Sequence, residues 1–198
     1  MSEERKVTFL GRLFGPRQSE TVRGTRVLIS ASDESFAPDL KADSICYKNH
    51  YRDVRTQRFE SFSGMCDSLR DVDVVHFFSN VKSNGDMLFE RDRCSAMRLL
   101  DACVLADVKL LIVANANAPE AYVNNFNARG KRLNLIMTLD RKNAIFADWL
   151  NGLLAGLAGG VDLPTVWVKI APQTAGPWHD TIPSCIFYAG RPKTLLLD

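Results

Sequence analysis

The sequence lacks a long hydrophobic run. Its most apolar stretch, residues 144–158, is interrupted by Asp148 and Asn151, whereas a membrane-spanning helix needs roughly 18 or more apolar residues. The opening residues, MSEERK, place acids beside bases and lack the apolar segment of a secretory signal. We therefore expect a soluble, cytoplasmic protein that does not associate with membranes.

Excess charge and clustered cysteines are lacking as well. The net charge is +2, which gives no electrostatic reason to expect nucleic-acid binding. The cysteines are odd in number and show no metal-ligand spacing, which argues against a disulfide framework and against a zinc site. No glycine-rich phosphate-binding motif follows the first expected strand. We expect neither a metal nor a cofactor. The five cysteines are Cys46, Cys66, Cys94, Cys103 and Cys185.

Short apolar runs alternate with helical patterns from residue 26 onward. This alternation predicts an α/β fold with three layers, in which helices cover both faces of a mostly parallel sheet. Helices are expected within 38–51, at 64–69 with Ser63 as N-cap, at 92–106, at 119–130, and from Asp140 to 158. Strands are expected at 27–31, 57–62, 72–79, 109–114, 133–139, 165–170 and 184–188, with a hairpin arm at 87–89.

The length of 198 residues suits one domain, which we place at residues 25–198. Residues 1–24 form a basic and apolar leader that contains Phe9, Arg12 and Phe14. Its plain interpretation is an accessory segment packed on the domain edge. The alternative is a docking segment for a partner, for which Trp178 in the proline-rich loop 172–183 is a second candidate, since exposed aromatic and arginine side chains favour interfaces.

Polar residues follow neighbouring strands at the points where ligands gather in parallel sheets. Ser32 follows the first strand, Ser79 and Asn80 follow the strand at 72–79, and Asn115 and Asn117 follow the strand at 109–114. Because the carboxyl ends of parallel strands share one edge, we expect Ser79, Asn80, Asn115 and Asn117 to line one cleft.

These two strands carry a resemblance to a known family. Residues 73–77, DVVHF, and residues 112–117, IVANAN, are similar to the two motif strands of the CHAT family of caspase-like cysteine proteases. The resemblance spans about residues 26–190 and implies a caspase-like fold. In that family the first motif ends in Gly-His-Gly, where this chain has residues 79–81, SNV, and the second holds the nucleophilic cysteine, where this chain has Asn117.

The departures from the family pattern predict an inactive domain. A cysteine protease needs a thiolate and an imidazole that activates it, and asparagine supplies neither group at Asn80 or Asn117. The resemblance therefore implies a pseudoprotease that acts as a protein-binding or regulatory subunit in prokaryotic signalling or immunity. Its partner would be another protein, either an active protease, a larger complex or a second copy of the chain.

Two other functions stay open at this point. One is a small-molecule sensor or enzyme on a flavodoxin-like sheet, with Ser32, Asn80 and Asn117 around a pocket. The topology separates this alternative from a caspase-like fold: a flavodoxin-like sheet would end in a helix, whereas a caspase-like sheet would place the strand at 184–188 on an edge. The other is an active peptidase with a shifted register, which requires a cysteine beside a histidine. His76 and Cys103 are the nearest such pair, although both fit core positions better.

Overall fold

A six-stranded sheet forms the centre of the computed structural model, which describes residues 20–142, 145–170 and 183–198. The strand order is β3-β2-β4-β7-β8-β9. Successive neighbours from β3 to β8 pair in parallel, and β9 pairs with β8 antiparallel. The strands are β2 (Arg26–Ala31), β3 (Asp53–Arg58), β4 (Val74–Phe78), β7 (Leu110–Val113), β8 (Asn134–Asp140) and β9 (Ser184–Ala189).

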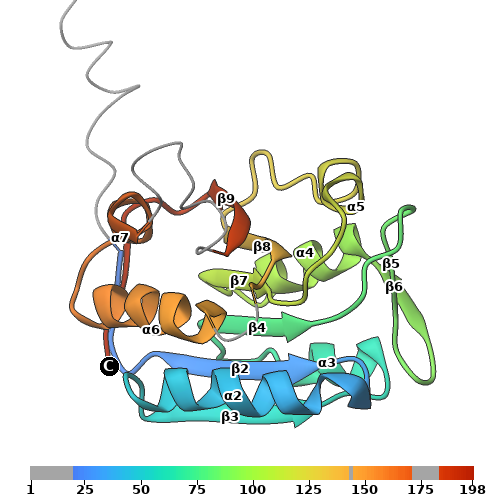
Figure 1. The fold of residues 1–198 in the computed structure, drawn as a ribbon, viewed down its shortest axis with the longest axis horizontal. Coiled ribbons are helices and arrows are strands. Elements are labelled where there is room, and N and C mark those ends of the chain that lie inside the picture. The colour runs from blue at the N-terminus through green and yellow to red at the C-terminus, as the bar shows by residue number, and fades with distance from the viewer. Residues whose placement is uncertain (1–19, 143–144, 171–182) are drawn as a thin grey trace, which may run out of the picture.

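Helices cover both faces of this sheet (Figure 1), so the predicted three-layer α/β architecture is confirmed. Successive residues of a strand face opposite sides of the sheet, and β4 divides its side chains accordingly: Val75 and Phe77 join one core cluster, and Val74 and Phe78 join the other. The first cluster includes α3 (Phe62–Asp67), α4 (Ala96–Leu105) and α5 (Pro119–Val123); the second includes α2 (Ala37–Lys48), α6 (Ile145–Ala158) and α7 (Leu163–Ile170).

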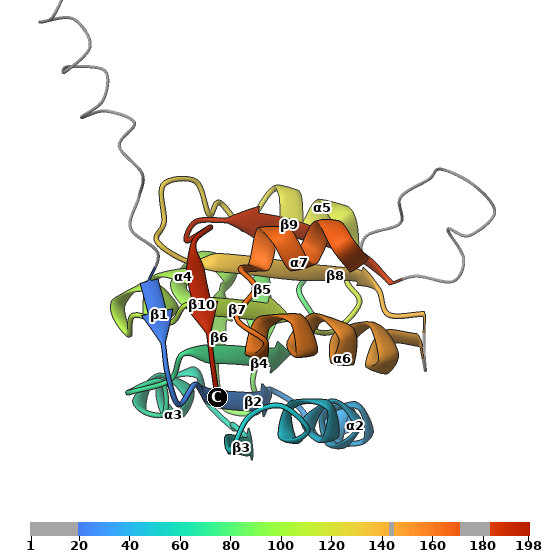
Figure 2. The same ribbon diagram turned by 90° about the vertical axis from the view of Figure 1, so that its left-hand side faces the viewer.

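Two small sheets lie outside the central one. The strands β5 (Asp86–Leu88) and β6 (Arg93–Ser95) form an antiparallel hairpin, which confirms the extra strand expected at 87–89. The strands β1 (Glu20–Val22) and β10 (Thr194–Leu196) pair in parallel and lie side by side in Figure 2. The last residues of the predicted leader therefore belong to the folded domain. The short helix η1 (Glu34–Phe36) connects β2 to α2.

The prediction of a strand at 165–170 is wrong, because these residues lie in the helix α7. Asp162 caps its first turn, since the carboxylate accepts hydrogen bonds from the Thr165 backbone N–H (3.1 Å) and hydroxyl (2.9 Å). Val166 is buried on the helix face toward α6, where its side chain fills the space beside Gly156. Valine favours strands over helices, but burial of Leu163 and Val166 on one face of α7 overrides this weak local preference, so the β-branched pattern misled the prediction.

Other predicted boundaries shift by a few residues. The helix expected at 64–69 is α3, and its N-cap is Ser61 rather than Ser63, since Ser61 Oγ accepts a hydrogen bond from the Gly64 N–H at 3.1 Å. The strand expected at 57–62 is β3, and the helices expected at 92–106 and within 38–51 are α4 and α2.

The helix expected at 119–130 ends at Val123, as α5. Asp140 ends β8 instead of capping a helix, because its carboxylate accepts the Lys142 N–H (2.9 Å) in a turn. Within the described residues, no helix has the length and apolar character needed to span a membrane.

Candidate functional site

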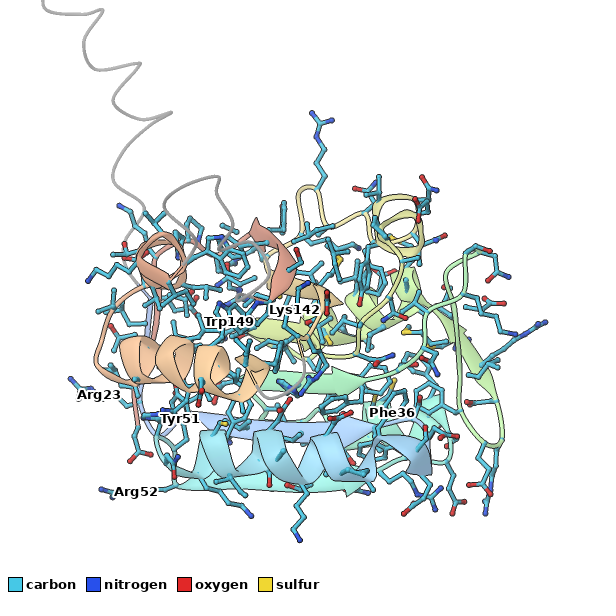
Figure 3. All side chains as sticks on the ribbon, in the orientation of Figure 1. Arg23, Phe36, Tyr51, Arg52, Lys142 and Trp149 are labelled. Atoms are coloured by element: carbon cyan, nitrogen blue, oxygen red, sulfur yellow. The ribbon has the colours of Figure 1, made fainter. Side chains whose placement is uncertain are left out.

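The carboxyl edge of the sheet brings the predicted polar residues together. The Ser32 hydroxyl donates a hydrogen bond to the Ser79 hydroxyl at 3.1 Å, which joins the ends of β2 and β4. The Asn115 amide donates to the Asn80 side-chain oxygen at 2.8 Å, which joins the ends of β4 and β7. Figure 3 labels Phe36 near this edge; its ring stacks on Phe78 with a centroid distance of 5.9 Å.

Asn117 holds the two strand ends together. Its Oδ1 accepts the Val81 N–H at 2.7 Å, and its Nδ2 donates to the carbonyls of Ser79 (3.2 Å) and Asn115 (3.0 Å) and to the Tyr122 hydroxyl (2.8 Å). The Tyr122 hydroxyl in turn donates to the Asn115 carbonyl at 3.0 Å. Both polar ends of the Asn117 amide are therefore engaged in fixing backbone.

The asparagine side chains at this edge are polar and uncharged. Asn80 is exposed, and Asn115 and Asn117 are half-buried. An amide donates and accepts hydrogen bonds but takes up no proton near neutral pH and provides no nucleophile. The edge can bind polar groups such as peptide backbone, and these asparagines cannot perform acyl transfer.

A buried charged network lies beneath the edge, between β4 and α2. His76 Nε2 lies 2.8 Å from Asp43 Oδ2, and its Nδ1 lies 3.0 Å from the Tyr47 hydroxyl. Arg141 donates to both Asp43 oxygens, at 2.9 and 3.1 Å. His76, Asp43 and Tyr47 are fully buried, which confirms His76 as a core residue with satisfied partners.

The electrostatics of the network favour a neutral histidine and an ionised aspartate. Burial lowers the pKa of His76 below its ordinary value, although the neighbouring Asp43 partly offsets this effect. Burial alone would raise the pKa of Asp43, but the hydrogen bonds from His76 and Arg141, together with the charge of Arg141, outweigh it and lower the pKa. Since a carboxylate only accepts, neutral His76 donates a hydrogen bond to Asp43 through Nε2–H and accepts one from the Tyr47 hydroxyl at Nδ1.

Arg141 connects this network to the strand ends. Its guanidinium also donates to the Ala114 carbonyl at 2.9 Å, directly before Asn115 in the chain. The guanidinium carbon lies 3.8 Å from the centre of the Phe146 ring and 5.2 Å from that of Phe78. The network thus stabilises the backbone that presents Asn115, and the sequence reasoning missed it.

The cysteines show no activated thiol. Burial raises the pKa of all five, to about 12 for Cys94 and Cys185. Cys103 belongs to the core cluster with α4, whereas His76 contacts α2 on the opposite face of the sheet. Among the described residues no cysteine is hydrogen-bonded to a histidine, and no group of three metal-ligating side chains occurs. The pair His76 and Cys103 therefore cannot act as a catalytic dyad.

The amino edge of the sheet holds a second polar region. A hollow of about 750 Å³ lies there, beside β1 and β10, and another of about 540 Å³ is lined by Tyr51 and Arg52, which Figure 3 labels at the end opposite Phe36. The predicted partner-binding residues Phe9, Arg12, Phe14 and Trp178 lie outside the described residues. Comparison of the chain with protein-family models and with curated proteins gives no match.

Proposed function

We propose that this chain is a catalytically inactive, caspase-like domain of the CHAT kind that acts as a protein-binding or regulatory subunit. The observation that carries the proposal is the pair of neighbouring strand ends where the resemblance implies a histidine and a cysteine. Asn80 and Asn117 occupy those ends, and the Asn117 amide is engaged in hydrogen bonds to the backbone around Asn80.

The topology supports a caspase-like sheet over a flavodoxin-like one. The order of the first five strands, β3-β2-β4-β7-β8, is common to flavodoxin-like sheets. The sixth strand, β9, lies on the edge and is antiparallel to β8. After α7 the described chain continues in the strands β9 and β10 and does not return to a helix that covers the sheet. The edge position of β9 is the arrangement expected of the caspase-like alternative.

The chemistry of the site supports binding over turnover. The strand-end amides form hydrogen bonds without providing a nucleophile, and burial raises the pKa of every cysteine thiol, which disfavours the reactive thiolate. A domain whose described strand-end edge carries amides in place of a thiol and an imidazole suits recognition of another protein. The resemblance places this role in prokaryotic signalling or immunity, with an active protease, a larger complex or a second copy as partner.

Affinity purification of the tagged full chain from its host tests the proposal. We expect a protein partner at fixed stoichiometry, quantified by mass spectrometry. The matched truncation removes residues 1–19 and keeps Glu20, because Glu20 pairs with Arg191 and its strand pairs with β10. Loss of the partner on truncation assigns docking to the leader. Purification of the chain alone from the host, with a small molecule retained, would instead favour the sensor alternative.

A further inference from the structure

The hollow at the amino edge has a rigid backbone frame. Its wall is made by residues 130–132 and 188–194 together with Glu20. Gly130 has φ +76°, and its N–H donates to the Tyr188 hydroxyl at 3.1 Å. A Cβ on Gly190 would lie 2.3 Å from the carbonyl oxygens of Lys131 and Leu133, so the two wall segments pack directly against each other. Such a preformed frame lowers the entropic cost of binding.

Arg191, which lines the hollow, and Lys109, which contacts the lining residue Glu20, already pair with carboxylates. Arg191 and Lys109 are nearly buried, and Arg191 donates to both oxygens of Glu20 at 2.9 and 3.0 Å. Lys109 Nζ lies 3.3 Å from Glu20, and Asp107 pairs with both cations. The attraction of these cations outweighs burial and lowers the pKa of Glu20. Glu20 lies on the strand β1, so these cations already pair with one carboxylate that an extended strand of the same chain presents.

Two cationic side chains on the rim of the hollow, Arg132 and Lys193, form no ion pair with a described carboxylate. Four lining side chains are cationic and one, Glu20, is acidic. Lys131 pairs with Asp101, and Arg191 pairs with Glu20 and Asp107. Within the described part of the chain, Arg132 and Lys193 have no ion pair and are exposed. Uncompensated cations around a concave surface attract negatively charged partners.

We propose that this hollow is the docking site for an acidic, extended segment of the protein partner, whose carboxylates pair with Arg132 and Lys193. Recognition of acidic motifs by clustered cations is a common mode of peptide binding. The half-exposed Tyr188 ring and Pro192 give the segment apolar contact between the charges. This inference rests on the proposed function, because it names the chemistry of that partner.

The test measures binding of a short fluorescein-labelled peptide of alternating glutamate and serine to the full chain by fluorescence anisotropy. The variant R132E/K193E reverses two rim charges. The matched control K41E/R55E reverses two exposed cations on α2 and β3 and changes the net charge equally. We expect saturable binding that weakens with salt, about tenfold weaker binding by R132E/K193E, and control binding within about twofold of the wild type. The milder pair R132Q/K193Q repeats the test if charge reversal impairs folding.

Three results would overturn the docking site: no saturable peptide binding, equal weakening in both double variants, or saturation by tripolyphosphate without peptide binding. The last would assign the hollow to a small phosphate-bearing ligand. The host complex separates this inference from the proposed function. If R132E/K193E still purifies with the partner, the surface is wrong and the function stands. If no partner is found but peptide binding follows the rim charges, the site stands and the function fails.

Discussion

Replacement of Asp43 by alanine tests the role assigned to the buried network. Asp43 is fully buried and accepts three hydrogen bonds, one from His76 and two from Arg141. Its removal leaves the Arg141 guanidinium, whose side chain is only 13% exposed, without its anion. Breaking one partner of a buried ion pair costs about 3–5 kcal/mol, a large share of the ~5–15 kcal/mol by which domains are stable.

A double-mutant cycle with Arg141→Met separates this coupling from the loss of packing. Urea denaturation followed by tryptophan fluorescence and circular dichroism gives the free energy of unfolding of each variant. We expect D43A/R141M to be more stable than the sum of the single effects predicts, by about 0.5–3 kcal/mol. A D43A protein within about 1 kcal/mol of the wild type, or strict additivity in the cycle, would refute the network as described.

The other predictions concern single groups. Since burial lowers the pKa of His76, the unfolded chain takes up a proton that the native chain does not when the pH falls below the ordinary histidine value. The free energy of unfolding of the wild type should therefore decrease as the pH is lowered from about 7.5 to about 5.5. His76→Asn should make this dependence on pH weaker in urea titrations, and an unchanged dependence would contradict a buried neutral imidazole. Asn117→Ala leaves buried backbone groups unpaired and should reduce the free energy of unfolding by about 1–3 kcal/mol, whereas replacing the exposed Asn80 by alanine should change it by less than about 0.5 kcal/mol. Thermal and urea denaturation measure both, and equal effects would contradict the role of Asn117 in holding the ends of β4 and β7 together. Ellman's reagent should label Cys94 and Cys185 slowly in the native protein and fully after unfolding, because burial raises the pKa of both thiols to about 12; rapid native labelling would contradict these raised pKa values.

The central strands were predictable because their residues are apolar on both faces. The run at 72–79 and the run at 109–114 have no polar alternation, which is typical of strands buried between helix layers, and both lie at the sheet centre as β4 and β7. The polar residues that follow them could be grouped at one edge for the same reason, since parallel strands align their carboxyl ends.

The remaining features depend on contacts between distant residues. Asp43 and Arg141 are 98 positions apart, and nothing in either local pattern indicates a buried ion pair. Glu20 seemed part of a leader because its three-residue strand is too short to show a period, and its partners Arg191 and Lys109 lie far along the chain. The residues of α7 have a strand-like local pattern, rich in β-branched and aromatic side chains, and the burial of one face of the helix against distant residues overrides it.

A peptide-hydrolysis assay tests the proposal that asparagines at the two strand ends leave the domain without peptidase activity. The purified full chain is incubated with a peptide library at neutral pH with a reductant, and cleavage is read by mass spectrometry. We expect no cleavage above that of a buffer control, because burial raises the pKa of all five thiols and Asn80 and Asn117 provide no acid, base or nucleophile. Sequence-specific cleavage that is abolished by replacing one of the five cysteines with serine would contradict it.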